Sequence, residues 1–358
     1  MNLLLVAAHE YLGLNALQCI HSKQDKIYIL GTKRALPLKL SRHCAGYINC
    51  DLKDLRKPSL QTIQKIKNYC KKKNIEVLLP TDLDSTLFLS RISMKVGVLR
   101  IFPISQTKTL ELLNNKWSFF NFLKKDTLPT PQTNLVTKLS DLKKLKMRFP
   151  AMIKPLQMQG GEGVVKIHSI ENAYEYLSVG NKYNQFPLIA QEYIDGDGID
   201  VSFLAYKGKI LAWTVQKNLP DGSIVFIKDS RILHLVEKIV TRSSYSGVAH
   251  IDMICERRTN EIKILEFNPR VWGSLLGSKF AGVDFLHLGL STVENDSAKL
   301  KFDYKKASYV TTKNFLQHFL RNDTGKEKDF KKLKNSDLWE MVTDPLPYFA
   351  CFIQELVS

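Results

Sequence analysis

The sequence contains no apolar run of about 18 residues, the length that a transmembrane helix requires. Its start, MNLLLVAAHEYLG, has an apolar run too short for a secretory signal and no basic residues before it, so we expect a first β-strand there. None of the six cysteines forms a C-x-x-C pair. We therefore expect free thiols in a reducing compartment, not a disulfide framework or a zinc site, and a cytoplasmic location.

The sequence also lacks the patterns of nucleic-acid-binding proteins, although its formal net charge is +17. Basic residues cluster at 65–74, 143–148 and 326–334, but no aromatic residues are interleaved as on a single-strand-binding surface. Helix-turn-helix and zinc-finger spacings are absent as well. We expect no nucleic-acid partner, and the charge alone leaves open an anionic substrate or a generally lysine-rich composition.

What is present first is an alternation of strands and helices over about the first hundred residues. The runs NLLLVAA, KIYILGT and IEVLLPTD read as strands, and helical patterns lie between them. Such alternation predicts an α/β domain with a parallel sheet and right-handed crossovers. The turn HEYLGLN lacks G-x-G-x-x-G, which argues against a dinucleotide site. Thr81 and Asp82, at the end of a strand, are candidates to line a cleft.

The rest of the chain changes to an α+β pattern. One helix is predicted over 105–127, and Pro129 and Pro131 follow it. Short β-rich segments come next, with a Lys-Gly hairpin signal at AYKGKI. Helices are predicted over 169–180, where Ser169 is an N-cap candidate, and over 230–247. A helical stretch is predicted after 275, through 280–293. The apolar end, DPLPYFACFIQELVS, is expected to be a docking helix and not a membrane anchor.

A lysine followed by a glycine-rich segment is the first chemical motif. In FPAMIKPLQMQGGEGVVKI a strand ends near Lys154, and Gly160, Gly161 and Gly163 precede the next strand. Backbone N–H groups of such a loop can face a phosphate, and the lysine supplies a positive charge to it. The pattern is not G-x-x-x-x-G-K-[ST], and by itself it also fits an ordinary glycine-rich hairpin.

Three oxygen-bearing side chains form the second motif. Asp252 and Glu266 lie on two strands joined by the turn ERRTN, and Asn268 shares a strand face with Glu266 because it is two residues away. Hard oxygen ligands of this kind suit Mg²⁺ completed by substrate phosphates. Arg270 would share that face if the strand continues through Pro269. A polar strand end with surface charges is the alternative, but burying such groups unpaired would be costly.

Taken in order with Lys116, early in a helix, and with the segment QEYIDG, these motifs resemble the ATP-grasp superfamily. The resemblance is strongest to its carboxylate–amine ligase branch, related to the ATP-grasp domains of carbamoyl-phosphate synthetase and biotin carboxylase. It implies an N-terminal parallel-sheet domain over 1–102 and an ATP-grasp fold over 103–300, in which two α+β subdomains grip ATP. The small lid subdomain would span about 150–195 and the larger one about 196–300, with a basic extension over 301–358.

The resemblance also implies roles for matching residues. Lys116 and Lys154 would contact ATP phosphates, with the loop around Gly160, Gly161 and Gly163 closing over them. Adenine would be held by Gln191, Glu192 and the Ile194 backbone, and ribose by Asp200. Mg²⁺, with Mn²⁺ as an alternative, would be bound by Asp252, Glu266 and Asn268. Arg270 would contact the acyl phosphate, and Gln216 and Lys217 would contact the nucleotide or the acyl phosphate.

The implied reaction is ATP-dependent joining of a small-molecule carboxylate to an amine through an acyl phosphate, with release of ADP and phosphate. Biotin-carboxylase-like members have a glutamate where this sequence has Ser274, which argues against bicarbonate activation. A phosphotransferase or carboxylating relative and a non-catalytic ATP-binding module are the alternatives. Many relatives are dimers, so a homodimer is also an open expectation.

Overall fold

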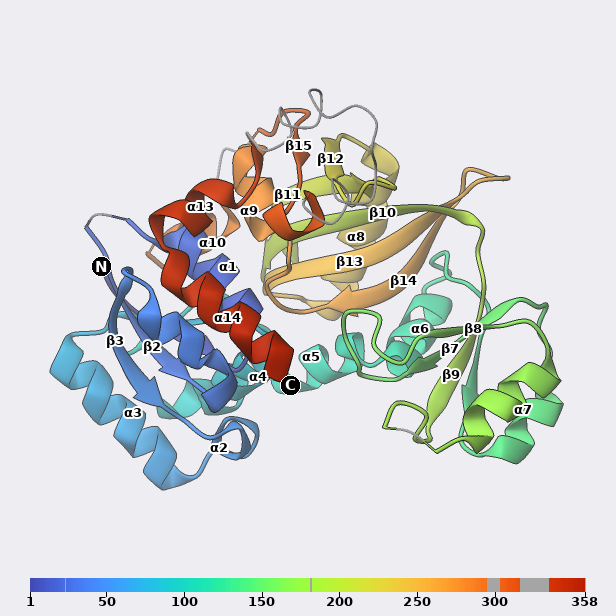
Figure 1. Cartoon of the computed structure of the whole chain (residues 1–358), viewed down its shortest axis with the longest axis horizontal. Helices are drawn as coiled ribbons and strands as arrows, with labels where there is room; N and C mark the ends of the chain where they lie inside the picture. The colour runs from blue at the N-terminus through green and yellow to red at the C-terminus, as the bar shows by residue number, and fades with distance from the viewer. Residues whose placement is uncertain (23, 181, 295–302, 316–334, 358) are drawn as a thin grey trace. The chain divides into compact units, whose positions relative to one another are not determined.

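The computed structural model describes residues 1–22, 24–180, 182–294, 303–315 and 335–357 (Figure 1). Contacts within the chain divide it into two compact units. Unit 1 comprises Met1–Leu110, Val201–His250 and Asn268–Ser358, and unit 2 comprises Glu111–Asp200 and Ile251–Phe267. The domain boundaries at 102 and 300 and the lid boundary near 195 stay predictions.

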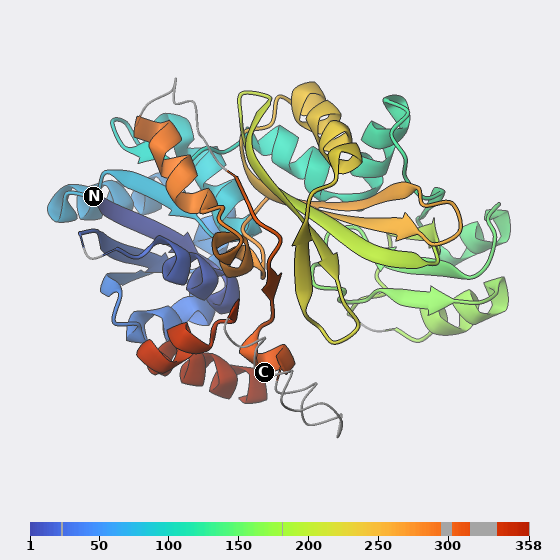
Figure 2. The ribbon, with the colours of Figure 1, turned by 90° about the horizontal axis from the view of Figure 1, so that it is seen from above.

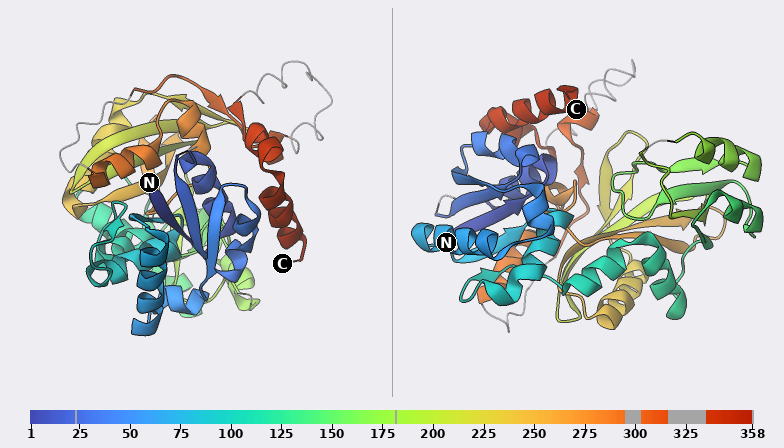
Figure 3. Two further views of the ribbon diagram at one scale, coloured as in Figure 1. Left: turned by 90° about the vertical axis from the view of Figure 1, so that its left-hand side faces the viewer. Right: turned by 90° about the horizontal axis from the view of Figure 1, so that it is seen from below.

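Unit 1 begins with a five-stranded parallel sheet of order β3-β2-β1-β4-β5. Its strands are β1 Asn2–Ala7, β2 Lys26–Gly31, β3 Cys44–Asn49, β4 Val77–Pro80 and β5 Arg100–Ile101. Leu3 and Leu5 pack in one core cluster and Leu4 and Val6 in another, so β1 is buried on both faces. Helices cover both faces, as Figure 3 shows, and the predicted parallel sheet is confirmed.

The helices of this part follow the strands in alternation. They are α1 Glu10–Ile20, the 3-10 helix η1 Lys33–Leu40, α2 Leu52–Arg56, α3 Leu60–Lys73, α4 Leu83–Ile92 and the 3-10 helix η2 Ser93–Lys95. For residues 33–56 the sequence predicted no element, yet they form η1, β3 and α2. The strand β3 was missed because CAGYIN lacks both a clean alternation and a long apolar run.

A six-stranded sheet has the order β14-β13-β10-β11-β12-β15. Its strands are β14 Ile262–Asn268, β13 Gly247–Glu256, β10 Gly196–Tyr206, β11 Lys209–Asn218, β12 Ile224–Ile227 and β15 Ser308–Tyr309. Lys207 (φ 49°) and Gly208 (φ 77°) turn β10 into β11 with positive φ at both positions, which confirms the predicted hairpin. Helix α8 Ser230–Ser243 packs against β11, as is visible in Figure 2.

Unit 2 contains a four-stranded antiparallel sheet of order β6-β9-β7-β8. The strands are β6 Thr133–Val136, β9 Leu188–Glu192, β7 Ala151–Pro155 and β8 Val165–Ile167, and the 3-10 helix η3 Leu139–Lys144 and helix α7 Ile170–Ser178 share their core. The Ser169 hydroxyl accepts from the Asn172 N–H at 3.1 Å, so the predicted N-cap is confirmed.

Two predicted helices are each divided in the structure. The helix expected over 105–127 is two helices, α5 Thr107–Asn114 and α6 Lys116–Lys125. Asn115 leaves the helical region (φ −81°, ψ 119°), and its side chain caps α6 by accepting from Trp117 and Ser118. The stretch after residue 275 is α9 Leu275–Phe280 and α10 Phe285–Glu294, separated at Gly282, whose φ of 108° no helix accommodates.

The C-terminal helices α13 Leu338–Thr343 and α14 Pro345–Val357 belong to unit 1. Helix α14 packs against η1 and α1, as expected of a docking helix. Asp344, between the two helices, accepts from the Arg42 N–H at 3.0 Å and from Ser41 Oγ. Within the described residues, no helix combines the length and apolarity needed to cross a bilayer.

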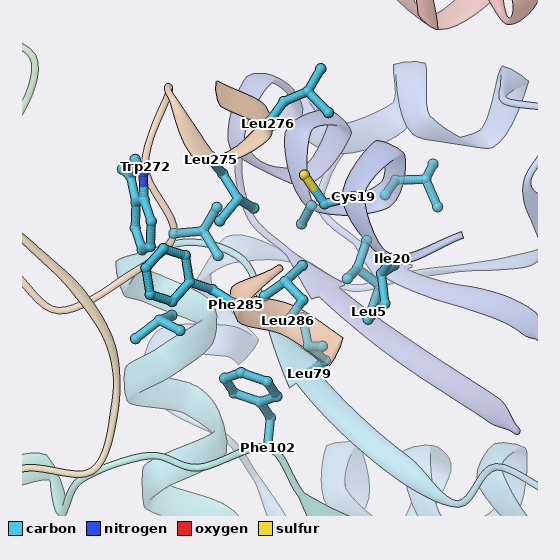
Figure 4. Packing of buried hydrophobic residues seen from close by; sticks show 14 of the residues in the cluster. Leu5, Cys19, Ile20, Leu79, Phe102, Trp272, Leu275, Leu276, Phe285 and Leu286 are labelled. Carbon is cyan, nitrogen blue, oxygen red and sulfur yellow. The ribbon is translucent and has the colours of Figure 1, made fainter. Parts of the chain in front are cut away.

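The largest core cluster of unit 1 joins the parallel sheet to the segment after β14. Figure 4 shows Leu275 and Leu276 near Cys19 of α1, and Trp272 beside Phe285. Trp272 is 2% exposed and meets Phe285 edge to face at 5.1 Å between ring centroids. This packing holds the loop after β14 against the amino-terminal helix.

All six cysteines are free thiols, as predicted.

The turn between β1 and α1 is organised by one buried carboxylate, Asp82. Its oxygens accept from the backbone N–H groups of Ala8 (2.7 Å), His9 (3.1 Å) and Ser85 (2.9 Å) and from Thr81 Oγ1 (3.1 Å). Asp82 is 5% exposed and Thr81 is fully buried. The hydrogen bonds of both side chains are made to residues of unit 1. Asp82 therefore fixes the carboxyl edge of the sheet between β1 and β4.

We expect Asp82→Ala to lower the free energy of unfolding by about 3 kcal/mol, because it leaves several buried donors without an acceptor. Asp84→Ala, two residues away, is the matched control, since its carboxylate pairs with an exposed Arg56 and its loss should cost less than about 1 kcal/mol. Urea unfolding of the three proteins measures both values. Equal midpoints for Asp82→Ala and the unsubstituted protein would contradict this role.

Candidate active site

Lys116 is placed by the helix break at Asn115, which makes it the first residue of α6. Its Nζ donates to Glu266 Oε1 at 2.8 Å and to the Met158 carbonyl at 2.8 Å. The Lys116 side chain is only 3% exposed, whereas that of Glu266 is 21% exposed. The amino group is thus a buried positive charge held between a carboxylate and the loop of residues 156–164, which we call the glycine-containing loop.

Lys154 lies on β7, next to β9 in the small sheet of unit 2. Its Nζ donates to Gln191 Oε1 at 2.6 Å, and Gln191 Nε2 donates to Thr133 Oγ1 at 3.0 Å. Burial lowers the pKa of Lys154 to about 8; the Glu266 carboxylate opposes this shift and the charge of Lys116 adds to it. A phosphate beside Lys154 would restore its full charge.

Glu266 and Asp252 supply the negative charges at the same place. Burial raises the pKa of Glu266, Lys116 opposes the shift, and the nearby Asp252 carboxylate raises it further. Asp252 also acts on Lys154. We call Lys116, Lys154, Asp252 and Glu266 the lysine–carboxylate cluster, all within unit 2. The buried Lys116 and the partly buried Lys154, beside two acids, can receive a polyphosphate and a divalent cation together.

Asp200 lies close to Asp252, and the sequence did not predict this proximity. Its Oδ1 lies 3.5 Å from the Met253 N–H, and a carboxylate oxygen lies within 4.8 Å of one on Asp252. Asp200 is 7% exposed. The pairing of β10 with β13 causes this proximity, and no local motif could have shown it. The ribose role of Asp200 stays a prediction.

The glycine-containing loop, residues 156–164, joins β7 to β8, which pair antiparallel as predicted. Gly160, Gly161 and Gly163 all have positive φ (64°, 77° and 70°). A Cβ on Gly163 would lie 2.7 Å from the Tyr183 Cβ, whereas Gly160 and Gly161 face open space. The Lys116 N–H also donates to the Leu156 carbonyl at 3.0 Å. The loop therefore starts at the lysine–carboxylate cluster and has room at its tip.

The segment predicted to hold adenine follows β9. Gln191 is 3% exposed and engaged with Lys154, and Ile194 is 8% exposed. The Glu192 N–H donates to the Gln132 carbonyl at 2.8 Å, and Glu192 Oε2 accepts from the Gln132 N–H at 3.2 Å. These contacts tie the end of β9 to the chain before β6. Adenine contacts by Gln191, Glu192 and Ile194 stay predictions.

Asn268, Arg270, Gln216 and Lys217 belong to unit 1. The condition under which Arg270 would share the face of Glu266 is not met, because β14 ends at Asn268 and the Arg270 N–H donates to the Asn268 carbonyl at 2.9 Å. Proline has no N–H to continue the ladder. The Arg270 guanidinium donates to the Val271 carbonyl at 2.8 Å and to Asn268 Oδ1 at 3.3 Å. The alternation of side chains along β14 therefore does not place Arg270 on the same face as Glu266.

The strand β11 carries Gln216 and Lys217 near its end, opposite Phe226 and Val225 of β12. Gln216 is 4% exposed, and its Oε1 accepts from the Ser274 hydroxyl at 2.8 Å. The sequence drew attention to Ser274 only as a departure from a family pattern. Its contact links the predicted site residue Gln216 to a residue that lies 58 positions further along the chain.

Comparison with known proteins decides the family of the central segment. The profile described as "ATP-grasp domain" matches residues 113–274. These residues are an ATP-grasp domain. The match includes the whole lysine–carboxylate cluster, the glycine-containing loop and Arg270.

One curated protein to which this chain is similar is the carbamoyl phosphate synthase large chain of Caldanaerobacter subterraneus subsp. tengcongensis. It is 20% identical over an alignment of 223 residues that covers 57% of this chain and 20% of that protein. The chain therefore spans only about a fifth of the length of this relative.

Two solved structures share the fold. The biotin carboxylase domain dimer of the Hydrogenobacter thermophilus 2-oxoglutarate carboxylase, with ADP, its magnesium salt and bicarbonate, has a TM-score of 0.66 at 14% identity, covering 84% of this chain and 71% of that one. The L-amino acid ligase of Bacillus licheniformis has a TM-score of 0.63 at 14% identity, covering 86% and 78%. These likenesses show the α/β fold with its N-terminal parallel and later antiparallel sheets.

The lowered pKa of Lys154 gives a testable pH dependence. Below about pH 8 Lys154 carries its charge before the nucleotide binds, so ADP affinity should be constant there and then fall by up to about tenfold per unit at higher pH. Lys154→Arg should remove this decline, because a guanidinium keeps its charge throughout. Calorimetric titration with ADP and Mg²⁺ from pH 7 upward measures both profiles, and identical slopes would contradict the assignment.

Proposed function

We propose that this chain is an ATP-dependent ligase that joins a carboxylate to an amine through an acyl phosphate, with release of ADP and phosphate. The observation that carries the proposal is the partly buried contact of Lys116 with Glu266, with Lys154 and Asp252 beside it. In a chain whose residues 113–274 are an ATP-grasp domain, this cluster has the charges that ATP and a divalent cation require.

ATP would exchange the internal contacts of the lysines for contacts with phosphates. Lys116 and Lys154 would each neutralise phosphate charge, and the N–H groups of the loop around Gly160, Gly161 and Gly163 would close over the phosphates. The remaining nucleotide contacts would be those of adenine with Gln191, Glu192 and the Ile194 backbone, of ribose with Asp200, and of the nucleotide or acyl phosphate with Gln216.

The donor set fits a divalent cation. Asp252 and Glu266 offer carboxylate oxygens and Asn268 an amide oxygen, which are the hard ligands that Mg²⁺ prefers and that Mn²⁺ also accepts. Burial and the Asp252 charge raise the pKa of Glu266, and a bound cation would counteract both effects by favouring the ionised carboxylate. When bound, the cation would supply charge neutralisation at the phosphates.

The chemistry would then proceed in two steps. An oxygen of the substrate carboxylate attacks the γ-phosphorus of ATP, the bond to the bridging oxygen breaks, and ADP leaves. The Arg270 guanidinium, with Lys217 as a second cation, would stabilise the charge that develops on the acyl phosphate. The amine nitrogen then attacks the acyl carbon, phosphate leaves, and the nitrogen loses a proton. Closure of the glycine-containing loop would keep water from the acyl phosphate.

Small-molecule substrates, a homodimer and a cytoplasmic location complete the proposal. One structural neighbour is itself a dimer with ADP, magnesium and bicarbonate, and another is an amino acid ligase. Ser274, where carboxylating relatives carry a glutamate, favours the ligase over bicarbonate activation. In this chain the Ser274 hydroxyl donates a hydrogen bond to Gln216 Oε1.

We expect ADP, phosphate and an amide product when the protein is incubated with Mg²⁺-ATP and pooled carboxylates and amines. Glu266→Gln should lower the rate at least about a hundredfold, because it removes a charge that holds both Lys116 and the cation. Coupled ADP detection and mass spectrometry measure the products. Glu261→Gln is the matched control, since that carboxylate pairs with Lys263 and is 61% exposed.

Other products would identify another function. A stable phosphorylated compound would identify a phosphotransferase, and a carboxylated one a carboxylating enzyme. ADP binding without turnover for any pooled substrate would indicate a nucleotide-binding module.

A further inference from the structure

The C-terminal helices α13 and α14 of unit 1 expose a row of large apolar side chains. Within each helix these residues recur three or four positions apart, the spacing that places side chains on one side of a helix. Their exposed fractions are 71% for Trp339, 64% for Val342, 58% for Leu346, 64% for Phe349, 57% for Phe352 and 44% for Ile353. We call these six residues the C-terminal apolar face.

The opposite side of α14 is already packed on unit 1. Tyr348 and Cys351 contact the largest core cluster, and the helix lies against η1 and α1. Asp344, which is 3% exposed, fixes the start of α14 through its bonds from the Arg42 N–H and the Ser41 hydroxyl. Figure 3 shows α14 on the outside of the N-terminal part of this unit. A helix that is apolar on both sides is normally covered on both, so the C-terminal apolar face is a surface for a partner.

The 3-10 helix η1, on which α14 packs, brings positive charge to this part of unit 1. Its exposed side chains are those of Lys33, Arg34, Leu36, Lys39 and Leu40, and the exposed Arg42 follows shortly after. No described side chain of η1, α13 or α14 is an exposed carboxylate, since Glu340 is half-buried. Cations mixed with exposed leucines beside an aromatic face are complementary to an anionic lipid surface.

We propose that α13 and α14 dock this protein on the surface of an anionic lipid bilayer. The C-terminal apolar face would enter the head-group region, and Lys33, Lys39 and Arg42 would contact lipid phosphates. The helices would lie in the plane of the membrane, because no helix among the described residues is long and apolar enough to cross it. The inference goes beyond the proposed reaction, and its test uses no ATP, so either can fail without the other.

A second copy of this chain is the alternative occupant of the face. In a two-fold dimer the same patch of both copies forms the interface. The basic side chains around α14 would then approach those of the other copy, and like charges repel. The net charge of +17 adds to this repulsion. An anionic bilayer instead attracts the same charges, so it is the occupant that the charge distribution favours.

Helix α3 shows that exposed lysines alone do not make such a surface. It exposes Lys65, Lys71 and Lys72, but within this fully described helix Leu60 is the one large apolar side chain that is exposed, at 78%. Stable attachment to a bilayer takes two contributions, burial of apolar groups and attraction of basic groups. The surface around α14 has both, whereas α3 has only the second.

Co-sedimentation of the full-length protein with lipid vesicles tests the docking. One set of vesicles contains phosphatidylcholine alone, and the other contains phosphatidylcholine and phosphatidylglycerol in equal parts. We expect the affinity for the anionic vesicles to be at least about tenfold higher, because several basic side chains contribute. That affinity should fall as the salt concentration rises, because salt screens exposed charges.

Substitution of the apolar face tests the contribution of burial. Phe349→Gln combined with Phe352→Gln should weaken binding at least about tenfold, because two aromatic side chains no longer enter the lipid. Leu60→Gln combined with Val98→Gln is the matched control and should bind as the unsubstituted protein does. Leu60 and Val98 are also exposed apolar residues of unit 1, at 78% and 100%, but lie outside the face.

Substitution of the basic residues tests the contribution of charge. Lys33→Gln combined with Lys39→Gln should weaken binding to the anionic vesicles and leave binding to neutral vesicles unchanged. Both lysines are exposed on η1, so their loss removes charge without opening the core. Thermal melting verifies that each variant is folded.

Trp339 provides a second measurement that does not depend on substituting α14. Of the four tryptophans it is the exposed one, so its fluorescence should shift to shorter wavelength when anionic vesicles are added. Trp339→Phe should abolish the shift. This measurement decides the matter if the variant with both phenylalanines replaced does not fold.

Several results would overturn the proposal: no binding to either kind of vesicle, equal affinity for both kinds, unchanged binding of the folded variant lacking both phenylalanines, or no shift in fluorescence. Analytical ultracentrifugation without lipid tests the alternative occupant. A dimer that this variant converts to monomers, together with no vesicle binding, would identify the face as an interface between copies and would also overturn the proposal.

Discussion

The contact of the buried Lys116 with the partly buried Glu266 is the interaction on which the rest of the candidate site depends. It joins the start of α6, the end of β14 and, through Met158, the glycine-containing loop. Burying such a pair carries a desolvation penalty, and removing one partner typically costs about 3–5 kcal/mol. A hydrophobic contact at this position would not carry this desolvation penalty. The presence of the ion pair is explained if a nucleotide and a cation replace its internal contacts during function.

Much of the fold follows from local patterns in the sequence. The apolar runs of the first strands, the Lys207–Gly208 turn and the Ser169 cap were predictable because neighbouring residues decide them. The two divided helices were not, because the division at Asn115 depends on a side chain that can either continue a helix or cap the next one. The end of β14 at Asn268 follows from Pro269, whose missing N–H is visible in the sequence.

The candidate site was predictable where chemistry is written in short motifs, as for Lys154 and its glycines or for the strand with Glu266. It was not predictable where distant strands bring residues together, as for Asp200 beside Asp252. The contact of Glu10, which follows β1, with Arg34, which follows β2, was missed for the same reason. The available signal was that charged residues follow two neighbouring parallel strands, whose carboxyl ends meet at one edge.

The central claim is that ATP activates a carboxylate as an acyl phosphate, and isotope transfer tests it most directly. The protein is incubated with Mg²⁺-ATP, pooled amines and pooled amino acids whose carboxylates carry oxygen-18, and the released phosphate is analysed by mass spectrometry. The account predicts phosphate with one labelled oxygen, because the attacking carboxylate oxygen leaves with the phosphoryl group. Release of phosphate without label would contradict it, since that phosphate would come from attack by water on ATP.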